Sequence, residues 1–598
     1  MTNQTPRGAS EPRALRGDMP GSNGQWAGRE KLAPSEKMPS PAAQVQDGAR
    51  ELVETVVFVV VLVLLLKSFV AEAFVIPTGS MATTLWGYQS VIECPQCHYT
   101  FPINANEQVE HGLILTGCTC PNCRLEIKFP PRYRGEQPVE RMPASTGDRV
   151  LVSKYIYDSG LIAPKRLDVV VFKYPKQPQE DFVQMNYIKR LIGLPGETIG
   201  IHYGKLYVLS ADQSAPHGSD AGADPLDLWQ TPHMHEDAAL DWLTREDTPF
   251  QIVRKPPDKI LSMRRIVYDN DHPAEDLTDT AWQRWTSTTA AWTSDPDHTF
   301  QHAQPSNQGT DWLRYRNVFR GENRSPQLIT DFLGYNTSIA DGMRPPQSQN
   351  WVGDLLIECE IQVDKPQGEL VLELSKGVDR FRAQWDLAAA DGRCKLIRAT
   401  GDQEKTLHDG PTSLKPGAAH RVRFANIDDR LLVWIDNQLP FGDGVVYSAP
   451  REHGPRANDL EPASIGFRGD GSVSVRHLQL WRDTYYTLKP GGGPQEADYA
   501  AVSPRDSSED MIREFSQPEK WSDPVYWAPL QRLPGKTLYV QPGHYLCLGD
   551  NSPHSSDGRT WGLVPERLLL GRALLVYYPF RFPYWPLSAP VNRIGLIR

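Results

Sequence analysis

A serine follows closely on the longest apolar run of the sequence. The run begins near Leu52, contains VVFVVVLVLLL and continues to Ile76, and the segment FVIPTGSM then places Ser80 close to Pro77 and Gly79. A serine hydroxyl becomes a nucleophile only when a base removes its proton. The sequence offers no convincing set of serine, histidine and aspartate for this chemistry, so a lysine is the other candidate base.

Lys189 is the lysine best placed for that role. It lies in YIKRLIGLPGE, an apolar and β-prone stretch, where alternating side chains would point Lys189 inward and Arg190 outward. Burial disfavours the ammonium form of a lysine, so a buried lysine can lose its proton near neutral pH and act as a general base. The alternative interpretation is a solvated charge at the edge of a sheet.

Four stretches in order resemble the bacterial signal peptidase I family. They are FVIPTGSMATTL (74–85), TGDRVLVSKYIY (146–157), RLDVVVFKYP (166–175) with YIKRLIGLPGE (187–197), and GDNSPHSSDGRTWGLVPE (549–566). This family consists of membrane-bound serine proteases with a Ser/Lys dyad on a mostly β fold. The chain departs from the family pattern at Thr83, where proline is usual, and at Leu167, where glycine is usual.

The resemblance implies a role for each matching residue. Ser80 would be the nucleophile and Lys189 the general base, while the Thr78 hydroxyl and the Ser80 backbone N–H would form the oxyanion hole. Ser555 would hydrogen-bond the lysine amine and orient it. The implied supporting pairs are Asp550 with Arg190 and Asp557 with Arg559, and the walls of a shallow pocket for small substrate residues would be Phe74, Ile76, Met81, Leu85, Tyr187 and Ile188. These apolar side chains could equally be plain core.

The function implied by the resemblance is the removal of signal peptides from exported preproteins by a serine endopeptidase, through an acyl-enzyme and without a catalytic cofactor. The expected partners are signal peptides, membrane lipid and the protein-export translocon. A different interpretation is a membrane-anchored envelope protein that binds glycans or proteins and carries an inactive peptidase scaffold. A self-cleaving Ser/Lys regulator is a third, but the apolar run before Ser80 and the absence of a DNA-binding segment argue against it.

Length, charge and hydropathy bound the organisation of the chain. The 598 residues predict two or more domains, and a net charge of −10 gives no basic face for nucleic acid. Residues 1–50 are rich in proline, glycine, serine and alanine, which predicts a disordered segment, and their lysines and arginines predict a cytoplasmic location. Residues 52–76 predict one transmembrane helix in the cytoplasmic membrane, with the catalytic domain on the outer face; a cleavable signal peptide is the alternative.

Two CPxC motifs form the one internal repeat. Cys94 and Cys97 are followed after 22 residues by Cys120 and Cys123, within a zinc-ribbon-like insertion at 91–127. Four thiolates can hold a structural zinc ion in a closed tetrahedral site that has no open position for catalysis. Two disulfides are the alternative in an oxidising compartment, and Cys118 in CTC leaves the ligand set open.

The remaining pattern predicts a mainly β protein in which an insertion divides the catalytic domain into 77–209 and 535–598. Residues 210–310 show no sustained period and predict an irregular segment, and residues 486–534 predict a linker. Alternation in LLIECEIQV and similar short stretches predicts an antiparallel β-sandwich at 311–485. This sandwich weakly resembles laminin-G or concanavalin-like jelly rolls, which implies a glycan or protein ligand; a brace without a ligand is the alternative.

Overall fold

The computed structural model of the chain covers most of the sequence. It describes residues 41–65, 71–129, 133–134, 137–138, 142–158, 162–175, 185–213, 236–245, 247–287, 289–302, 309–320, 324–340, 350–448, 454–491, 497–501, 527, 530–578 and 594–597. Residues 1–65 and 66–598 form two separate compact units. The predicted disorder of residues 1–40 lies outside the described residues.

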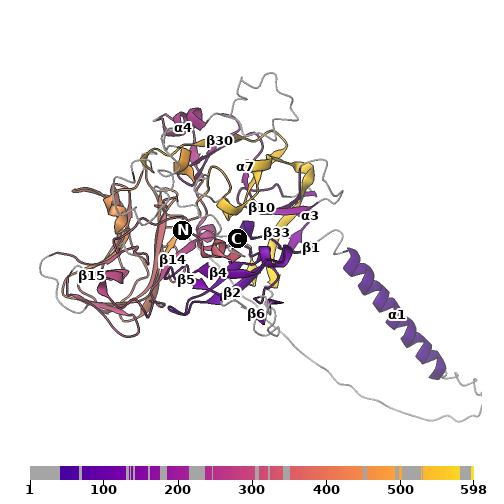
Figure 1. The fold of residues 1–598 in the computed structure, drawn as a ribbon, viewed down its shortest axis with the longest axis horizontal. Coiled ribbons are helices and arrows are strands. Elements are labelled where there is room, and N and C mark those ends of the chain that lie inside the picture. Colours follow the sequence, from indigo (N-terminus) through magenta and orange to yellow (C-terminus); the bar gives the residue numbers. More distant parts are fainter. Residues whose placement is uncertain are drawn as a thin grey trace, which may run out of the picture. The chain divides into compact units, whose positions relative to one another are not determined.

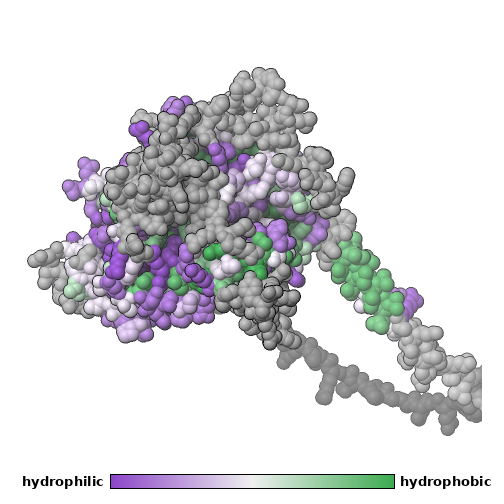
Figure 2. Space-filling view, viewed as in Figure 1, coloured by the Kyte–Doolittle hydropathy of each residue, from purple (hydrophilic) through white to green (hydrophobic). Residues whose placement is uncertain are grey.

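The first unit contains one helix, α1 (Pro41–Leu65). Its apolar side chains between Leu52 and Leu65 are 42% to 66% exposed, and Figure 2 shows them as a green surface along the helix. Within the part of the chain that the structure describes, no helix is both long enough and apolar enough to cross a bilayer. The prediction of one continuous helix over 52–76 is wrong, because α1 ends at Leu65 and Ala71–Val75 form the strand β1. The helix also begins inside the segment predicted to be disordered.

An antiparallel sheet joins segments from both ends of the second unit. Its order is β1-β8-β33-β9-β10-β31-β32, and β34 pairs with β33. The yellow strands of the C-terminal segment lie beside the indigo and purple strands of the early chain in Figure 1, as the pairing of β33 with β8 requires. The bounds are β8 (Arg149–Ser153), β9 (Val169–Lys173), β10 (Asn186–Gly193), β31 (His544–Leu548), β32 (Val564–Pro565), β33 (Leu569–Tyr578) and β34 (Gly595–Leu596).

A second, four-stranded sheet packs on the same core. Its order is β13-β12-β11-β30, with bounds Gln251–Ile252, Lys205–Leu209, Thr198–His202 and Lys536–Tyr539. The helices α4 (Glu236–Thr244) and α5 (Pro257–Met263) precede and follow β13. Tyr486 and Leu488 are buried in this core, so the prediction of a linker beginning at 486 is wrong for its first residues.

The insertion consists of two antiparallel sheets around one apolar core. One has the order β16-β17-β29-β20-β25-β26-β27 with β14 paired to β29, and the other has the order β15-β18-β28-β21-β22-β23-β24. Both sheets contribute buried side chains to this core, among them Ile357, Leu372 and Phe424. The bounds are β14 (Arg265–Asp269), β15 (Trp285–Ser287), β16 (Trp292–Ser294), β17 (Phe300–His302), β18 (Asp311–Tyr315), β20 (Leu355–Lys365), β21 (Glu369–Lys376), β22 (Asp379–Asp386), β23 (Cys394–Thr400), β24 (Gln403–Gly410), β25 (Ala419–Ile427), β26 (Arg430–Ile435), β27 (Val445–Val446), β28 (Ala463–Arg468) and β29 (Ser472–Arg482).

The mainly β class is confirmed, but the predicted start of the insertion is wrong. The two-sheet body begins with β14 at Arg265, inside the segment predicted to be irregular. β15, β16 and β17 have three residues each, and so short a strand shows no detectable alternation. The jelly-roll class of the sandwich stays a prediction.

The cysteine motifs lie in a small subdomain of short strands. It contains β2 (Gln89–Glu93) paired with β3 (Thr100–Asn104), and β4 (Leu115–Thr119) paired with β5 (Glu126–Lys128). The short helix α2 (Asn106–Glu110) connects the two hairpins. A strand of the inserted region, β19 (Ile339–Ala340), pairs with β4 and so ties this subdomain to the insertion.

Candidate active site

Ser80 lies on a one-turn 3-10 helix, η2 (Gly79–Met81), that follows β1. Hydrogen bonds close the base of this turn: the Ile76 N–H donates to the Asp148 carbonyl at 3.0 Å, and the Tyr88 N–H donates to the Pro77 carbonyl at 3.0 Å. The Trp86 N–H donates to the Asp148 carboxylate at 2.9 Å. The backbone around Ser80 is therefore held on both sides.

Lys189 reaches this turn from β10. Its Nζ donates a hydrogen bond to the Ser80 Oγ at 2.6 Å. The exposed fraction is 7% for Ser80 and 3% for Lys189, so water has little access to the pair. β10 lies between β9 and β31 in the sheet, and this central position fixes the lysine backbone beside η2.

Burial sets the protonation of the lysine. Desolvation lowers the pKa of Lys189 from 10.5 to about 8, although the charges of Asp557 and Asp550 partly oppose this shift. A lysine with this pKa is partly neutral near pH 8, and a neutral amine can accept a proton from a serine hydroxyl. The pair has the geometry and the protonation that a serine nucleophile and its base require.

Arg190 and Asp550 form a fully buried ion pair beside the lysine. The guanidinium Nε and Nη2 donate to the two carboxylate oxygens at 2.7 Å and 2.6 Å. Burial alone would raise the pKa of Asp550, but Arg190 and a 2.5 Å hydrogen bond from the Thr84 hydroxyl keep it below its usual value. The prediction that Arg190 points outward to solvent is wrong, because both faces of β10 are covered from Ile188 onward.

A second buried pair, Asp557 with Arg559, lies on the segment after β31. The guanidinium donates to the carboxylate at 2.9 Å and 2.7 Å, and it also donates to the Thr487 carbonyl at 2.6 Å. Asp557 accepts from the Gly549 N–H at 3.0 Å, which shapes the turn around Asp550. Ser555 is buried nearby, but its hydroxyl has no hydrogen-bond partner, so the predicted contact with the lysine amine is absent among the described residues.

The other predicted residues surround the turn in different ways. Thr78 is exposed and directly precedes η2, where the first N–H groups of a helix lack an intrahelical acceptor. Met81 and Leu85 are fully buried and pack in one apolar cluster with Ile76 and Ile188, with Phe74 at its edge. Tyr187 packs in another cluster, stacked on Tyr174 with ring centroids 4.8 Å apart.

The structure adds two residues that the sequence analysis missed. The Asn551 side chain donates to the Gly79 carbonyl at 3.0 Å, and its backbone N–H donates to the Ser80 carbonyl at 3.0 Å. The buried Arg265 of β14 donates to the Ala82 carbonyl at 3.0 Å and to the Asp550 carbonyl at 3.2 Å. Asn551 stands in the GDNS motif and could have been found there, but no local pattern marks Arg265.

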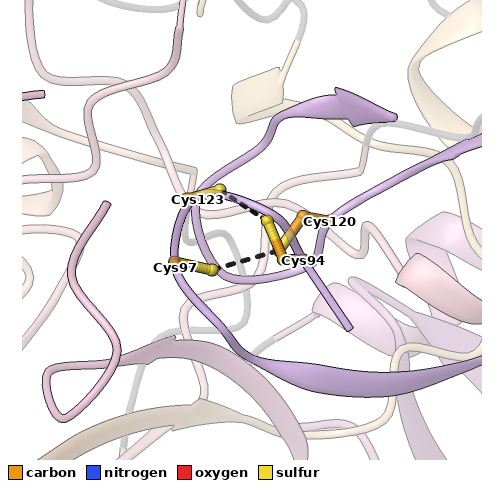
Figure 3. Close-up of side chains that lie close together, drawn as sticks. All are labelled: Cys94, Cys97, Cys120 and Cys123. Carbon is orange, nitrogen blue, oxygen red and sulfur yellow. Dashed lines mark hydrogen bonds between the residues drawn. The ribbon is translucent and has the colours of Figure 1, made fainter. Parts of the chain in front are cut away.

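The four cysteines of the CPxC motifs lie together and buried. Figure 3 shows their side chains converging from two loops, with Cys94 opposite Cys123 at 3.5 Å and Cys97 opposite Cys120 at 3.6 Å between sulfur atoms. All four sulfur atoms lie within 4.8 Å of one another, and none forms a disulfide. The cluster can hold a metal ion, and the buried Cys118 is outside it.

Comparison with known proteins agrees with the motifs. The family model described as signal peptidase, peptidase S26, matches residues 139–264 and 483–578. Signal peptidase I of Pseudomonas aeruginosa is 28% identical over 212 residues, which cover 33% of this chain and 69% of that protein. Signal peptidase I of Buchnera aphidicola subsp. Acyrthosiphon pisum is 39% identical over 69 residues, which cover 11% of this chain and 22% of that protein.

The matches leave the insertion outside the family. The gap between the two matched segments, 265–482, coincides with the two-sheet body. A carbohydrate-binding module, CBM66 from Bacillus subtilis, is similar to 33% of this chain and 95% of its own length, at 12% identity and a TM-score of 0.22, which supports no conclusion about the insertion. The chain spans only about a fifth of the Buchnera relative, as the 22% coverage states. The family model and the named relatives nevertheless agree on one family, signal peptidase I.

Proposed function

We propose that the chain is an active signal peptidase that cleaves signal peptides from preproteins by a Ser80/Lys189 dyad. The observation that carries this proposal is the 2.6 Å contact between the Lys189 Nζ and the Ser80 Oγ, two side chains that are both buried. The low pKa of Lys189, about 8, supports the role of general base because a neutral amine is required before the reaction begins.

In the first half of the reaction, the neutral Lys189 amine takes the Ser80 proton as the Oγ attacks the scissile carbonyl carbon. The carbonyl oxygen becomes an oxyanion, which the Ser80 N–H and the Thr78 hydroxyl would stabilise by about 3 kcal/mol per donor. The intermediate then collapses, the C–N bond breaks, and the Lys189 ammonium returns the proton to the leaving amine. The signal peptide remains as an ester on Ser80.

In the second half, a water molecule replaces the amine. Lys189 takes a proton from this water, the resulting hydroxide attacks the ester, and the lysine returns the proton to the Ser80 oxygen as the C–O bond breaks. The products are the free carboxylate of the signal peptide and the regenerated serine. The buried pairs formed by Arg190 and Arg559 do not exchange protons in this scheme; they hold β10 and the segment after β31 against η2.

The test is cleavage of a preprotein that carries an Ala-x-Ala site by the detergent-purified full chain. Ser80→Ala and Lys189→Met should each abolish formation of the new N-terminus while the fold is kept. Ser90→Ala and Lys173→Met are matched controls, because Ser90 is a buried serine of β2 and Lys173 is a half-buried lysine of the neighbouring strand β9. Equal cleavage by all five proteins would overturn the proposal.

We also propose that α1 associates with a membrane. Apolar side chains from Leu52 to Leu65 are exposed on the described helix, and burial in lipid would remove this surface from water. Flotation of the full chain with liposomes tests this, with Val57→Asp and Leu62→Asp combined in one variant. The wild type should float and the variant should not; equal recovery of both in the dense fraction would contradict the association.

A further inference from the structure

The inserted region contacts the nucleophile turn through η4 (Gly334–Thr337). The ring of Tyr335 packs so closely on Gly79 that a Cβ built there would lie 2.4 Å from a ring carbon. Tyr335 also packs against Trp86, with ring centroids 4.9 Å apart and ring planes tilted by 47°, and its hydroxyl donates to the Tyr88 carbonyl at 3.2 Å. The glycine before Ser80 is therefore required by this contact with the insertion.

Two side-chain amides form a second contact between η4 and the surroundings of Ser80. Asn336 and Asn551 each donate to the other at 2.8 Å. Asn551 in turn binds the carbonyls of Gly79 and Ser80. The position of η4 thus fixes the two peptide groups on which the nucleophile lies.

The other side of η4 rests on the cysteine subdomain. A Cβ at Gly334 would lie 2.9 Å from the Pro121 ring of the second CPxC motif. The Thr119 N–H donates to the Thr337 hydroxyl at 2.9 Å, and Ile339 pairs with Gly117 in the β19 to β4 ladder. The single helical turn η4 therefore contacts the cysteine subdomain on one side and the turn that carries Ser80 on the other.

The cysteine subdomain has the local geometry of a metal site with two equivalent knuckles. In each motif the N–H four residues after the first cysteine donates to that cysteine's carbonyl: His98 to Cys94 at 2.9 Å and Arg124 to Cys120 at 3.1 Å. His98 and Arg124 both have a positive φ, 53° and 61°. Repetition of this turn presents two thiols from each loop toward one point.

The sulfur separations fit zinc. Zinc bound to four thiolates at about 2.3 Å places neighbouring sulfur atoms about 3.8 Å apart. The distances of 3.5 Å and 3.6 Å between opposing cysteines are close to this value. A site made of four soft thiolates with no further donor selects zinc or iron over magnesium and calcium.

We propose that Cys94, Cys97, Cys120 and Cys123 bind one Zn²⁺ ion, and that this site holds η4 against the turn that carries Ser80. The ion joins the two knuckles, the second knuckle supports Gly334 and Thr337, and η4 positions Gly79 and Asn551. The assignment of zinc to the four cysteines is independent of the proposed function. The role of the site in positioning the turn rests on the proposed function only in naming Ser80 as the nucleophile.

The first measurement is the metal content of the purified full chain, determined by inductively coupled plasma mass spectrometry. One zinc per chain is expected, and Cys97→Ser and Cys120→Ser should lose at least nine-tenths of it. Cys118→Ser is the matched control, a buried cysteine outside the cluster, and should keep its zinc. A wild type without metal, with oxidised cysteines, or with iron in place of zinc would overturn the assignment.

The second measurement is amide hydrogen exchange of the wild type before and after chelation, which needs neither cleavage nor a cysteine variant. Exchange in 77–88 and 334–340 should rise about tenfold without metal and recover when Zn²⁺ is added, while the sandwich strands β20 and β25 stay unchanged. Asn336→Ala should raise exchange in 77–88 at full zinc content. Asn458→Ala, whose contacts lie within the sandwich, is its control. Unchanged exchange in 77–88 after zinc removal would overturn the positioning role even if cleavage were never observed.

Discussion

The Lys189 Nζ lies 2.6 Å from the Ser80 Oγ although the two residues are 109 positions apart in the chain. Three backbone features bring them together: the closed turn after β1, the central place of β10 in the sheet, and the buried segment after β31. The carboxylate of Asp550 links all three, since it binds Arg190 of β10 and Thr84 of the turn. This arrangement has consequences for pH dependence and for stability.

Cleavage should require the neutral form of Lys189. Since burial lowers its pKa to about 8, we expect kcat/KM to rise about tenfold per pH unit below pH 8 and to level off above it. The measurement is a pH profile of preprotein cleavage under single-turnover conditions. Binding of the same preprotein to Ser80→Ala over the same range controls for substrate titration. A rate that is constant from pH 6 to pH 9 would contradict the role of Lys189 as base.

Replacement of the base should stabilise the fold at neutral pH. The folded-state pKa of Lys189, about 8, lies below its ordinary value of 10.5, so the unfolded chain holds a proton between these values that the folded chain lacks. The free energy of unfolding therefore rises with pH across this window and is reduced by about 3 kcal/mol below it. Lys189→Met removes this cost. Thermal unfolding should show the variant above the wild type at pH 7 and a smaller gap at pH 10; a lower transition temperature at pH 7 would refute the shift.

The sequence was informative where chemistry requires particular residue types in a fixed order. Ser80, Lys189 and Asp550 lie in motifs whose order resembles that of a known family, and the structure brings them to one place. The antiparallel insertion was predictable because strands such as β20, with 11 residues, are long enough to show alternation of apolar and polar residues, here from Ile357 to Asp364. Three-residue strands such as β16 carry too few positions for any period, which is why the start of the insertion was missed.

The features that the sequence did not predict depend on tertiary contacts between distant residues. The burial of Arg190 depends on Asp550, a residue 360 positions away, and alternation along one strand cannot reveal such a partner. The helix α1 and the strand β1 both lie in the segment predicted as one helix, because hydropathy alone does not distinguish a helix from a strand. The contacts of Arg265 with Ala82 and of Asn336 with Asn551 join the insertion to segments outside it, and no local pattern encodes them.

Loss of Asp550 should destabilise the protein more than loss of a partly exposed acid. Asp550→Ala leaves the guanidinium of Arg190 charged and buried, which costs about 3 to 5 kcal/mol. Glu369→Ala is the control, because Glu369 pairs with the half-exposed Arg468 at 2.9 Å, and such a pair contributes less than about 1 kcal/mol. Urea unfolding of both variants measures the difference. Equal urea midpoints for the two variants would show that the buried ion pair contributes no more to the free energy of unfolding than the partly exposed pair does.

Arg265 should couple the insertion to the turn that carries Ser80. Its guanidinium is buried and donates to the carbonyls of Ala82 and Asp550 and to the Thr83 hydroxyl at 2.7 Å. Arg265→Ala leaves these acceptors without a charged donor, so we expect the free energy of unfolding to fall by about 3 kcal/mol. The turn should also lose its fixed position, so kcat should fall at least tenfold while KM changes little, because the lost contacts orient Ser80 without touching substrate. Arg468→Ala, on the outer part of the sandwich, is the control and should keep both values. A variant whose stability falls with kcat unchanged would show that Arg265 holds the insertion in place without positioning the nucleophile.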